Sequence, residues 1–135
     1  MHKNAKQTVK SYLDRQAVDV KSTRSGLSFS LRGRRYQLWH DKDDPDFLRL
    51  TTPILLDVTR DNYARVIMAA NTLNAKCKVS KAVVYDFDDA DSDAAWICFE
   101  QILTENCPDA LLERIFDMMA TAAEEFDEEF DKIVS

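Results

Sequence analysis

Glycine, proline and cysteine are all scarce in this chain of 135 residues, which contains two Gly, three Pro and three Cys. Phosphate-binding loops need clustered glycines, whereas Gly26 and Gly33 stand alone, so the common nucleotide sites are excluded. Three cysteines are an odd number without paired spacing, which favours reduced thiols over a disulfide framework. We therefore expect a cytoplasmic protein without a bound nucleotide.

Long apolar runs are also missing from the chain. No stretch approaches the roughly 18 consecutive apolar residues of a membrane helix, and the beginning, MHKNAKQTVK, lacks the apolar segment of a secretory signal. The composition is nevertheless globular, because 45% of the residues are hydrophobic and 31% are charged. We predict a single domain over residues 1–135, with a packed core and no membrane partner.

Side chains for catalysis are few. The only imidazoles are His2 and His40, and a cysteine nucleophile needs a base beside a thiol of lowered pKa. Cys98 lies in an apolar run, where a free cysteine behaves as a small buried hydrophobe. His40 stands among loop aspartates, without the several nitrogen or sulfur ligands of a transition-metal site. We predict no catalytic residues, no cofactor and no metal, and hence no enzyme.

One acidic segment has the spacing of a calcium loop. Asp89, Asp91, Asp93 and Glu100 fall at positions 1, 3, 5 and 12 of an EF-hand. Ala94 occupies the position where the loop needs glycine, and the flanking residues alternate as in strands. We predict a solvated acidic turn without specific calcium binding.

The spacing of apolar residues switches repeatedly between helical periodicity and strict alternation. The switches predict helices over Asn4–Gln16, Asp57–Asn74 and Cys107–Val134, and strands over Leu27–Leu31, Arg35–His40, Phe47–Leu56, Lys81–Phe87 and Ala94–Leu103. Short connections favour antiparallel pairing. The predicted class is therefore α+β, with helices packed on an antiparallel sheet of about five strands in the order α-β-β-β-α-β-β-α.

Turn and capping residues refine these boundaries. Arg32-Gly33 is typical of a tight hairpin turn, in which Gly33 supplies a positive φ. Thr59 can cap the second helix, and Asn74 can end it in a left-handed conformation. Pro108 fits the start of the last helix.

Charge is distributed unevenly along the chain, whose net charge is −6. The first 40 residues hold nine Lys and Arg against two Asp, and residues 92–135 hold two against twelve Asp and Glu. A basic region can bind nucleic acid, but these cations lack interleaved aromatics. We therefore regard nucleic acid as an unlikely partner, and we expect the first helix to lie near the acidic end of the last, within one chain or across a dimer.

The strand Ala94–Leu103 is apolar on both faces, which is typical of a strand covered on both sides. Two arrangements satisfy this pattern: the helices divide between the faces, or one face keeps an apolar patch for a partner. In the second arrangement Trp96 lies at a dimer or client contact. The predicted partner-binding residues are Trp96, Cys98, Ile102 and Val84.

Three segments also carry a family resemblance. They are AANTLNAKCKVSKAVVYDF (Ala69–Phe87), AAWICFEQIL (Ala94–Leu103) and PDALLERIFDMMATAAEEFDE (Pro108–Glu128). Together with the element order, they resemble the type III secretion chaperone-like fold and, within it, the YbjN family. The resemblance implies a non-enzymatic protein-binding module: secretion chaperones of this fold are usually homodimers that hold an extended client, and YbjN relatives are described as regulators.

The expected function is thus a chaperone-like or regulatory adaptor that binds another polypeptide and acts as a homodimer. The alternative is a regulator that binds nucleic acid through its basic N-terminal region.

Overall fold

A computed structural model describes residues 3–54, 57–84, 95–103 and 107–133. The described elements are α1 (Ala5–Arg15), β1 (Val20–Ser22), β2 (Gly26–Leu31), β3 (Arg34–Trp39), β4 (Phe47–Pro53), α2 (Tyr63–Lys76), β5 (Ser80–Val84), β6 (Ala95–Ile102) and α3 (Asp109–Lys132). The predicted α+β class is confirmed, with one strand more than expected.

The strands form one antiparallel sheet in the order β1-β2-β3-β4-β6-β5. β4 lies near the middle, where Leu50 is opposite Leu38 of β3 and Phe99 of β6. The chain leaves β4, forms α2, adds β5 at the far edge and returns as β6 between β5 and β4. The sheet is therefore assembled from residues distant in the sequence.

The additional strand, β1, follows directly on α1. Asn4 caps this helix, because its side chain accepts from the Gln7 amide at 2.8 Å and the Gln7 side chain accepts from the Asn4 amide at 3.0 Å. The helix ends at Arg15, and Ala17 turns the chain with a φ of 56°. Val20 then pairs with Phe29 of β2, so the chain forms a strand here and does not extend the helix.

The β2–β3 hairpin confirms the predicted turn. Arg32 and Gly33 both have positive φ, 52° and 79°, as in the two-residue turns whose twist matches that of antiparallel strands. The space around Gly33 is open, so its backbone conformation, and not crowding, favours glycine there.

The helix α2 begins and ends later than predicted. Its first residue is Tyr63, because Thr59 and Asn62 bond to each other ahead of it: the Thr59 amide donates to Asn62 Oδ1 at 2.8 Å, and the Asn62 amide donates to Thr59 Oγ1 at 3.3 Å. The last residue is Lys76, so the prediction that Asn74 ends the helix is wrong.

Asn74 instead attaches α2 to the sheet. Its Nδ2 donates to the Ala82 carbonyl at 3.1 Å, and its Oδ1 accepts from the Ala82 amide at 2.7 Å. One side chain thus satisfies both backbone groups that Ala82 of β5 directs away from β6.

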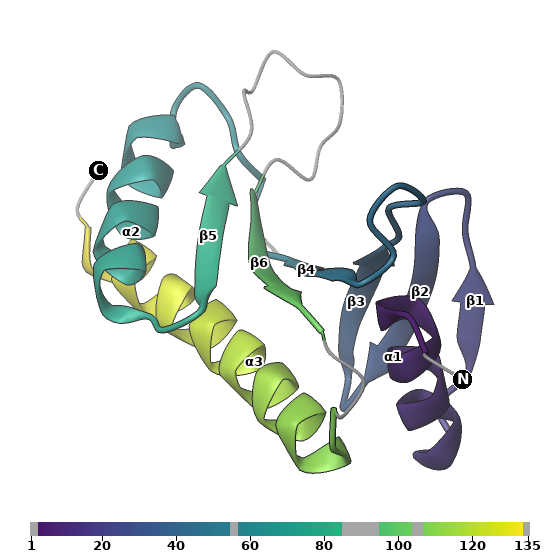
Figure 1. Cartoon of the computed structure of the whole chain (residues 1–135). Helices are drawn as coiled ribbons and strands as arrows, with labels where there is room; N and C mark the ends of the chain where they lie inside the picture. Colours follow the sequence, from purple (N-terminus) through teal and green to yellow (C-terminus); the bar gives the residue numbers. More distant parts are fainter. Residues whose placement is uncertain (1–2, 55–56, 85–94, 104–106, 134–135) are drawn as a thin grey trace.

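The three helices form one layer on one face of the sheet (Figure 1). α2 and α3 pack on β5 and β6, and α1 lies at the other end, against β1, β4 and the N-terminal half of α3. Four rings join this layer to β2 and β3, with centroids 5.1 to 6.1 Å apart: Tyr12, Phe29, Tyr36 and Phe116. Of the two arrangements considered for the helices, the chain adopts the one-sided one.

The prediction that the first helix lies near the acidic end of the last helix is wrong within one chain. Arg15 of α1 pairs with Asp109, the first residue of α3, at 2.6 Å. The acidic end of α3 lies beside α2, where Glu129 pairs with Lys76. Stacking of Tyr12 on Phe116 places α1 along the beginning of α3, so apolar packing and not the charge of the helix end sets its position.

Candidate functional site

The pairing register divides the strand residues between two faces. The helix-covered face carries the core side chains of the sheet, which are Leu27, Phe29, Leu31, Tyr36, Leu38, Leu48, Leu50, Ala82, Ala95, Ile97 and Phe99. No described helix lies over the opposite side, which we call the open face. It carries Trp39, Phe47, Arg49, Thr51, Pro53, Val83, Trp96, Cys98, Glu100 and Ile102.

Trp96 lies in the middle of an apolar row across the open face. It is opposite Pro53 on β4 and opposite Val83 on β5. Trp96 is half-buried and Val83 is 36% exposed, so this row keeps apolar surface in contact with water. A hollow of about 200 Å³ adjoins Trp96, with Pro53 and Gln37 in its wall.

A second hollow of about 280 Å³ lies on the same face, between Trp39 and Cys98. Trp39 Nε1 donates to Thr51 Oγ1 at 2.9 Å, which fixes the indole over β4. Thr51 is buried, although it belongs to the open face. Thr51 lines this hollow and Pro53 lines the first, so the two hollows are neighbours along β4.

A polar pair borders the apolar row. Arg49 Nη2 and Nε donate to Glu100 Oε2 at 2.8 and 3.0 Å across β4 and β6. The Arg49 guanidinium also lies 5.4 Å from the centroid of the Phe47 ring. The open face thus combines exposed apolar side chains with oriented charges, as protein interfaces do.

The chemistry of Cys98 argues against a nucleophile at this site. Burial, followed by the nearby Glu100 carboxylate, raises the pKa of the Cys98 thiol to about 11. The thiol is therefore protonated at neutral pH and contributes a small apolar surface.

Three of the four predicted partner-binding residues share the open face. Trp96, Cys98 and Ile102 alternate along β6, and Ile102 is 66% exposed beyond the end of β5. Val84 does not join them: it is opposite Ala95 and packs against the core from the helix-covered face. Val83 takes its place beside Trp96, because one residue of register reverses the face of every side chain.

Trp39 and Arg49 belong to this face and were missed from the sequence. The signal was present, since Trp39 alternates with Tyr36 and Leu38 in a strand whose other side is core. Arg49 needs more than its own strand, because its partner Glu100 is 51 positions further along the chain.

The described residues offer little for metal binding. Among residues 3–54, 57–84, 95–103 and 107–133, no group of three or more His, Cys, Asp and Glu side chains is arranged to hold a metal ion. The aspartates with the spacing of a calcium loop, Asp89, Asp91 and Asp93, lie outside the described residues.

The other two thiols resemble that of Cys98. Burial is the main cause that raises the thiol pKa of Cys77 and Cys107 above its ordinary value.

Comparison with solved structures shows a likeness of fold. No protein-family model matches the sequence, and no curated protein matches it. The fold is similar to the crystal structure of YbjN, with a TM-score of 0.64 over 91% of this chain and 86% of that chain, at 10% sequence identity. That protein is described as a candidate transcription regulator from E. coli.

No helix in the described part of the chain is both long enough and apolar enough to cross a membrane. The likeness to YbjN concerns the fold, which in this chain is one sheet with a single layer of described helices and an open face that carries Trp96.

Proposed function

We propose that the protein is a non-enzymatic adaptor that binds another polypeptide through the open face and acts as a homodimer. The observation that carries this proposal is the row of Pro53, Trp96 and Val83, which no described helix covers. Exposed apolar surface beside oriented charges is typical of protein interfaces, and tryptophan is enriched among the residues that dominate binding energy.

The geometry supports recognition of side chains. The two hollows lie along β4, and each is walled on one side by an indole ring, that of Trp39 or Trp96. Two apolar side chains of a partner can enter them, and the Arg49–Glu100 pair beside them can orient polar groups of that partner.

The chaperone-like role belongs to this proposal and not to the fold, because a likeness at 10% identity concerns the fold alone. A chaperone-like adaptor would hold its client on the open face. The protonated thiol of Cys98 supports a contact role for the centre of that face.

The test is Trp96→Arg, examined by light scattering for molecular mass and by circular dichroism for folding. A charged group in the centre of a desolvated contact weakens binding strongly, so we expect a folded protein of half the mass. Met68→Arg is the matched control, because Met68 is 54% exposed on α2, away from the open face.

Two outcomes would contradict the proposal. If Trp96→Arg unfolds the chain, Trp96 is part of the core. If the variant is folded and has the mass of the wild type and of Met68→Arg, the open face is not the dimer contact.

Nucleic acid is the alternative partner. The position of α1 favours it, since the acidic end of α3 lies beside α2 and does not pair with the cations of α1. Electrophoretic mobility shifts at low and high salt test it, because binding driven by phosphate contacts falls steeply as salt rises. No shift at low salt would exclude this alternative.

A further inference from the structure

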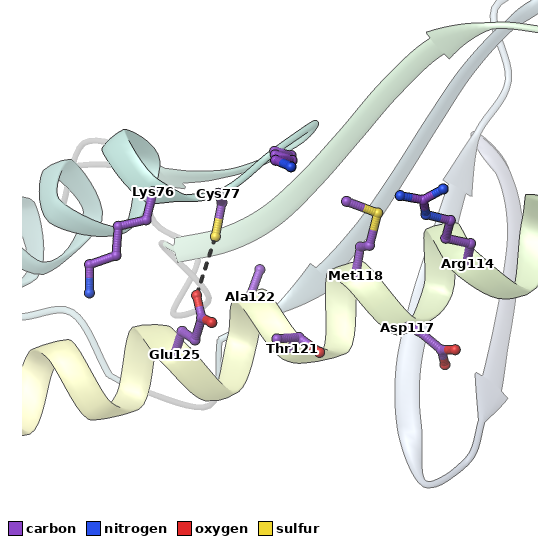
Figure 2. Close-up of a pocket in the computed structure, with 9 residues that line it drawn as sticks. Lys76, Cys77, Arg114, Asp117, Met118, Thr121, Ala122 and Glu125 are labelled. Atoms are coloured by element: carbon purple, nitrogen blue, oxygen red, sulfur yellow. Dashed lines mark hydrogen bonds between the residues drawn. The ribbon is translucent and has the colours of Figure 1, made fainter.

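Another hollow lies on the helix layer, away from the open face. It is a groove of about 320 Å³ between the end of α2 and the middle of α3. Arg114, Met118, Ala122 and Glu125 lie along one side of α3, and Cys77 faces Glu125 from the end of α2 (Figure 2). Met118 and Ala122 give the groove an apolar wall between a cation at one end and an anion at the other.

Most of the charged groups around the groove already have partners. Asp117 pairs with Arg32, and Lys76 pairs with Glu129. Glu125 Oε2 accepts a hydrogen bond from Cys77 Sγ, with 3.6 Å between the two atoms. Burial and Glu125 raise the pKa of that thiol, which therefore keeps its proton.

Two cations in the groove are different. Lys78 and Arg114 line it, and the side chain of neither forms a hydrogen bond or an ion pair with any described residue. The chain has a net charge of −6, so this pair of cations is a local exception to its charge. A partner that carries carboxylates and apolar side chains would be complementary to the two cations and to the apolar wall beside them.

The backbone beside Lys78 is held in a strained turn. Val79 has a φ of 58°, which is rare for a β-branched residue. The Ser80 amide donates to the Lys78 carbonyl at 2.6 Å and closes a three-residue turn around Val79. Strain of this kind is concentrated at binding sites, where it fixes the direction of a side chain.

We propose that this groove binds a peptide segment that has acidic residues at one end and apolar residues next to them. The carboxylates are attracted to Lys78 and Arg114, and the apolar side chains cover Met118, next to the buried Ala122. Arg114 and Glu125 are eleven residues apart on a helix, or about 16 Å, which corresponds to five residues of an extended peptide.

The experiment is an NMR titration of the full chain with the capped peptide Asp-Asp-Leu-Ala-Leu. We expect the largest amide shifts at residues 76–78 and 114–125, with an affinity that falls as salt rises. Two control peptides separate the contributions: Lys-Lys-Leu-Ala-Leu reverses the charge, and Asp-Asp-Ser-Ala-Ser removes the apolar side chains. Both should bind at least about tenfold more weakly.

Variants localise the effect. Arg114→Glu should weaken binding of the acidic peptide about tenfold or more, and Arg114→Ser should weaken it less. Lys21→Glu on β1 is the matched control for net charge, and it should leave the affinity unchanged. Trp96→Arg should also leave it unchanged, so the result is independent of the open face.

Several results would overturn the proposal: shifts outside the groove, equal binding of either control peptide, or equal loss in Lys21→Glu and Arg114→Glu. Arg114 is exposed and has no described partner, so both of its variants should remain folded. If Arg114→Ser binds the acidic peptide as wild type does, the cation plays no part and the proposal is wrong.

Discussion

Leu50 and Phe99 are opposite each other on β4 and β6, and so are their neighbours Arg49 and Glu100. The first pair faces the helices, and neither residue is more than 1% exposed to solvent. The second pair faces away and is 45% exposed at each side chain. A single step along the strand therefore separates residues that stabilise the fold from residues that remain available for contact, and substitutions on the two faces should differ accordingly.

The largest difference is expected between two aromatic residues of β6. Phe99→Ala should lower the free energy of unfolding by about 3–5 kcal/mol, because it leaves a cavity under the helices. Trp96→Ala should cost less than roughly half of that, since part of the ring is already in contact with water. Urea unfolding followed by circular dichroism measures both. Equal losses would mean that the open face is as much core as the other.

Reactivity of Cys98 sharpens the same comparison. A thiol pKa raised from 9.0 to about 11 leaves about a hundredfold less thiolate at pH 8 than in the unfolded chain. Alkylation followed by mass spectrometry should show slow modification at pH 8 that accelerates toward pH 11. Glu100→Gln should lower this pKa and speed the reaction, because the carboxylate contributes to the shift.

The sign of the related stability effect follows from the same shift. The folded state favours the protonated thiol of Cys98. The stability that this preference adds is therefore fully present below the unfolded pKa of 9.0, and it is lost as the pH rises toward the folded pKa of about 11. Cys98→Ser should flatten the fall in stability over this pH interval. Rapid modification of Cys98 at pH 8 in the folded protein would contradict both expectations.

The attachment of α2 gives the next effect. Asn74→Ala removes both bonds to Ala82 and should lower the free energy of unfolding by about 1–3 kcal/mol. Hydrogen exchange at the Ala82 amide should accelerate in the variant. Asn71→Ala is the control, because Asn71 is exposed on the same helix. Equal stability of the two variants would show that solvent replaces the amide without cost.

The smallest effect is expected from the charged pair on the open face. Glu100→Gln should change the free energy of unfolding by less than about 1 kcal/mol, since exposed ion pairs contribute little to stability. Thermal unfolding at low and high salt measures this effect. A loss as large as that of Phe99→Ala would show that the pair belongs to the core.

Alternation and helical spacing predicted the class, the three helices and five of the six strands, because each of these elements shows its periodicity within its own residues. β1 was missed for a physical reason: Val20–Ser22 is too short for a period, and it is a strand only because Phe29 and its neighbours pair with it.

The candidate site was predicted in part. Two apolar faces on β6 pointed to Trp96, Cys98 and Ile102, but β5 is apolar on both sides as well. Only the pairing of Val83 with Trp96 shows which of its residues faces outward, and this register depends on contacts between strands. The position of α1 was missed because stacking of Tyr12 on Phe116 is a long-range contact that charge counting does not reveal.

The amide of Asn74 also bears on aggregation. A sheet grows without limit when a foreign strand can add to its outermost backbone groups. At the β5 side, Asn74 already occupies the backbone groups of Ala82. At the other side, β1 offers three residues, among them the exposed Lys21. Little room therefore remains for strand addition at either border of the described sheet, and growth of this sheet into fibrils is disfavoured.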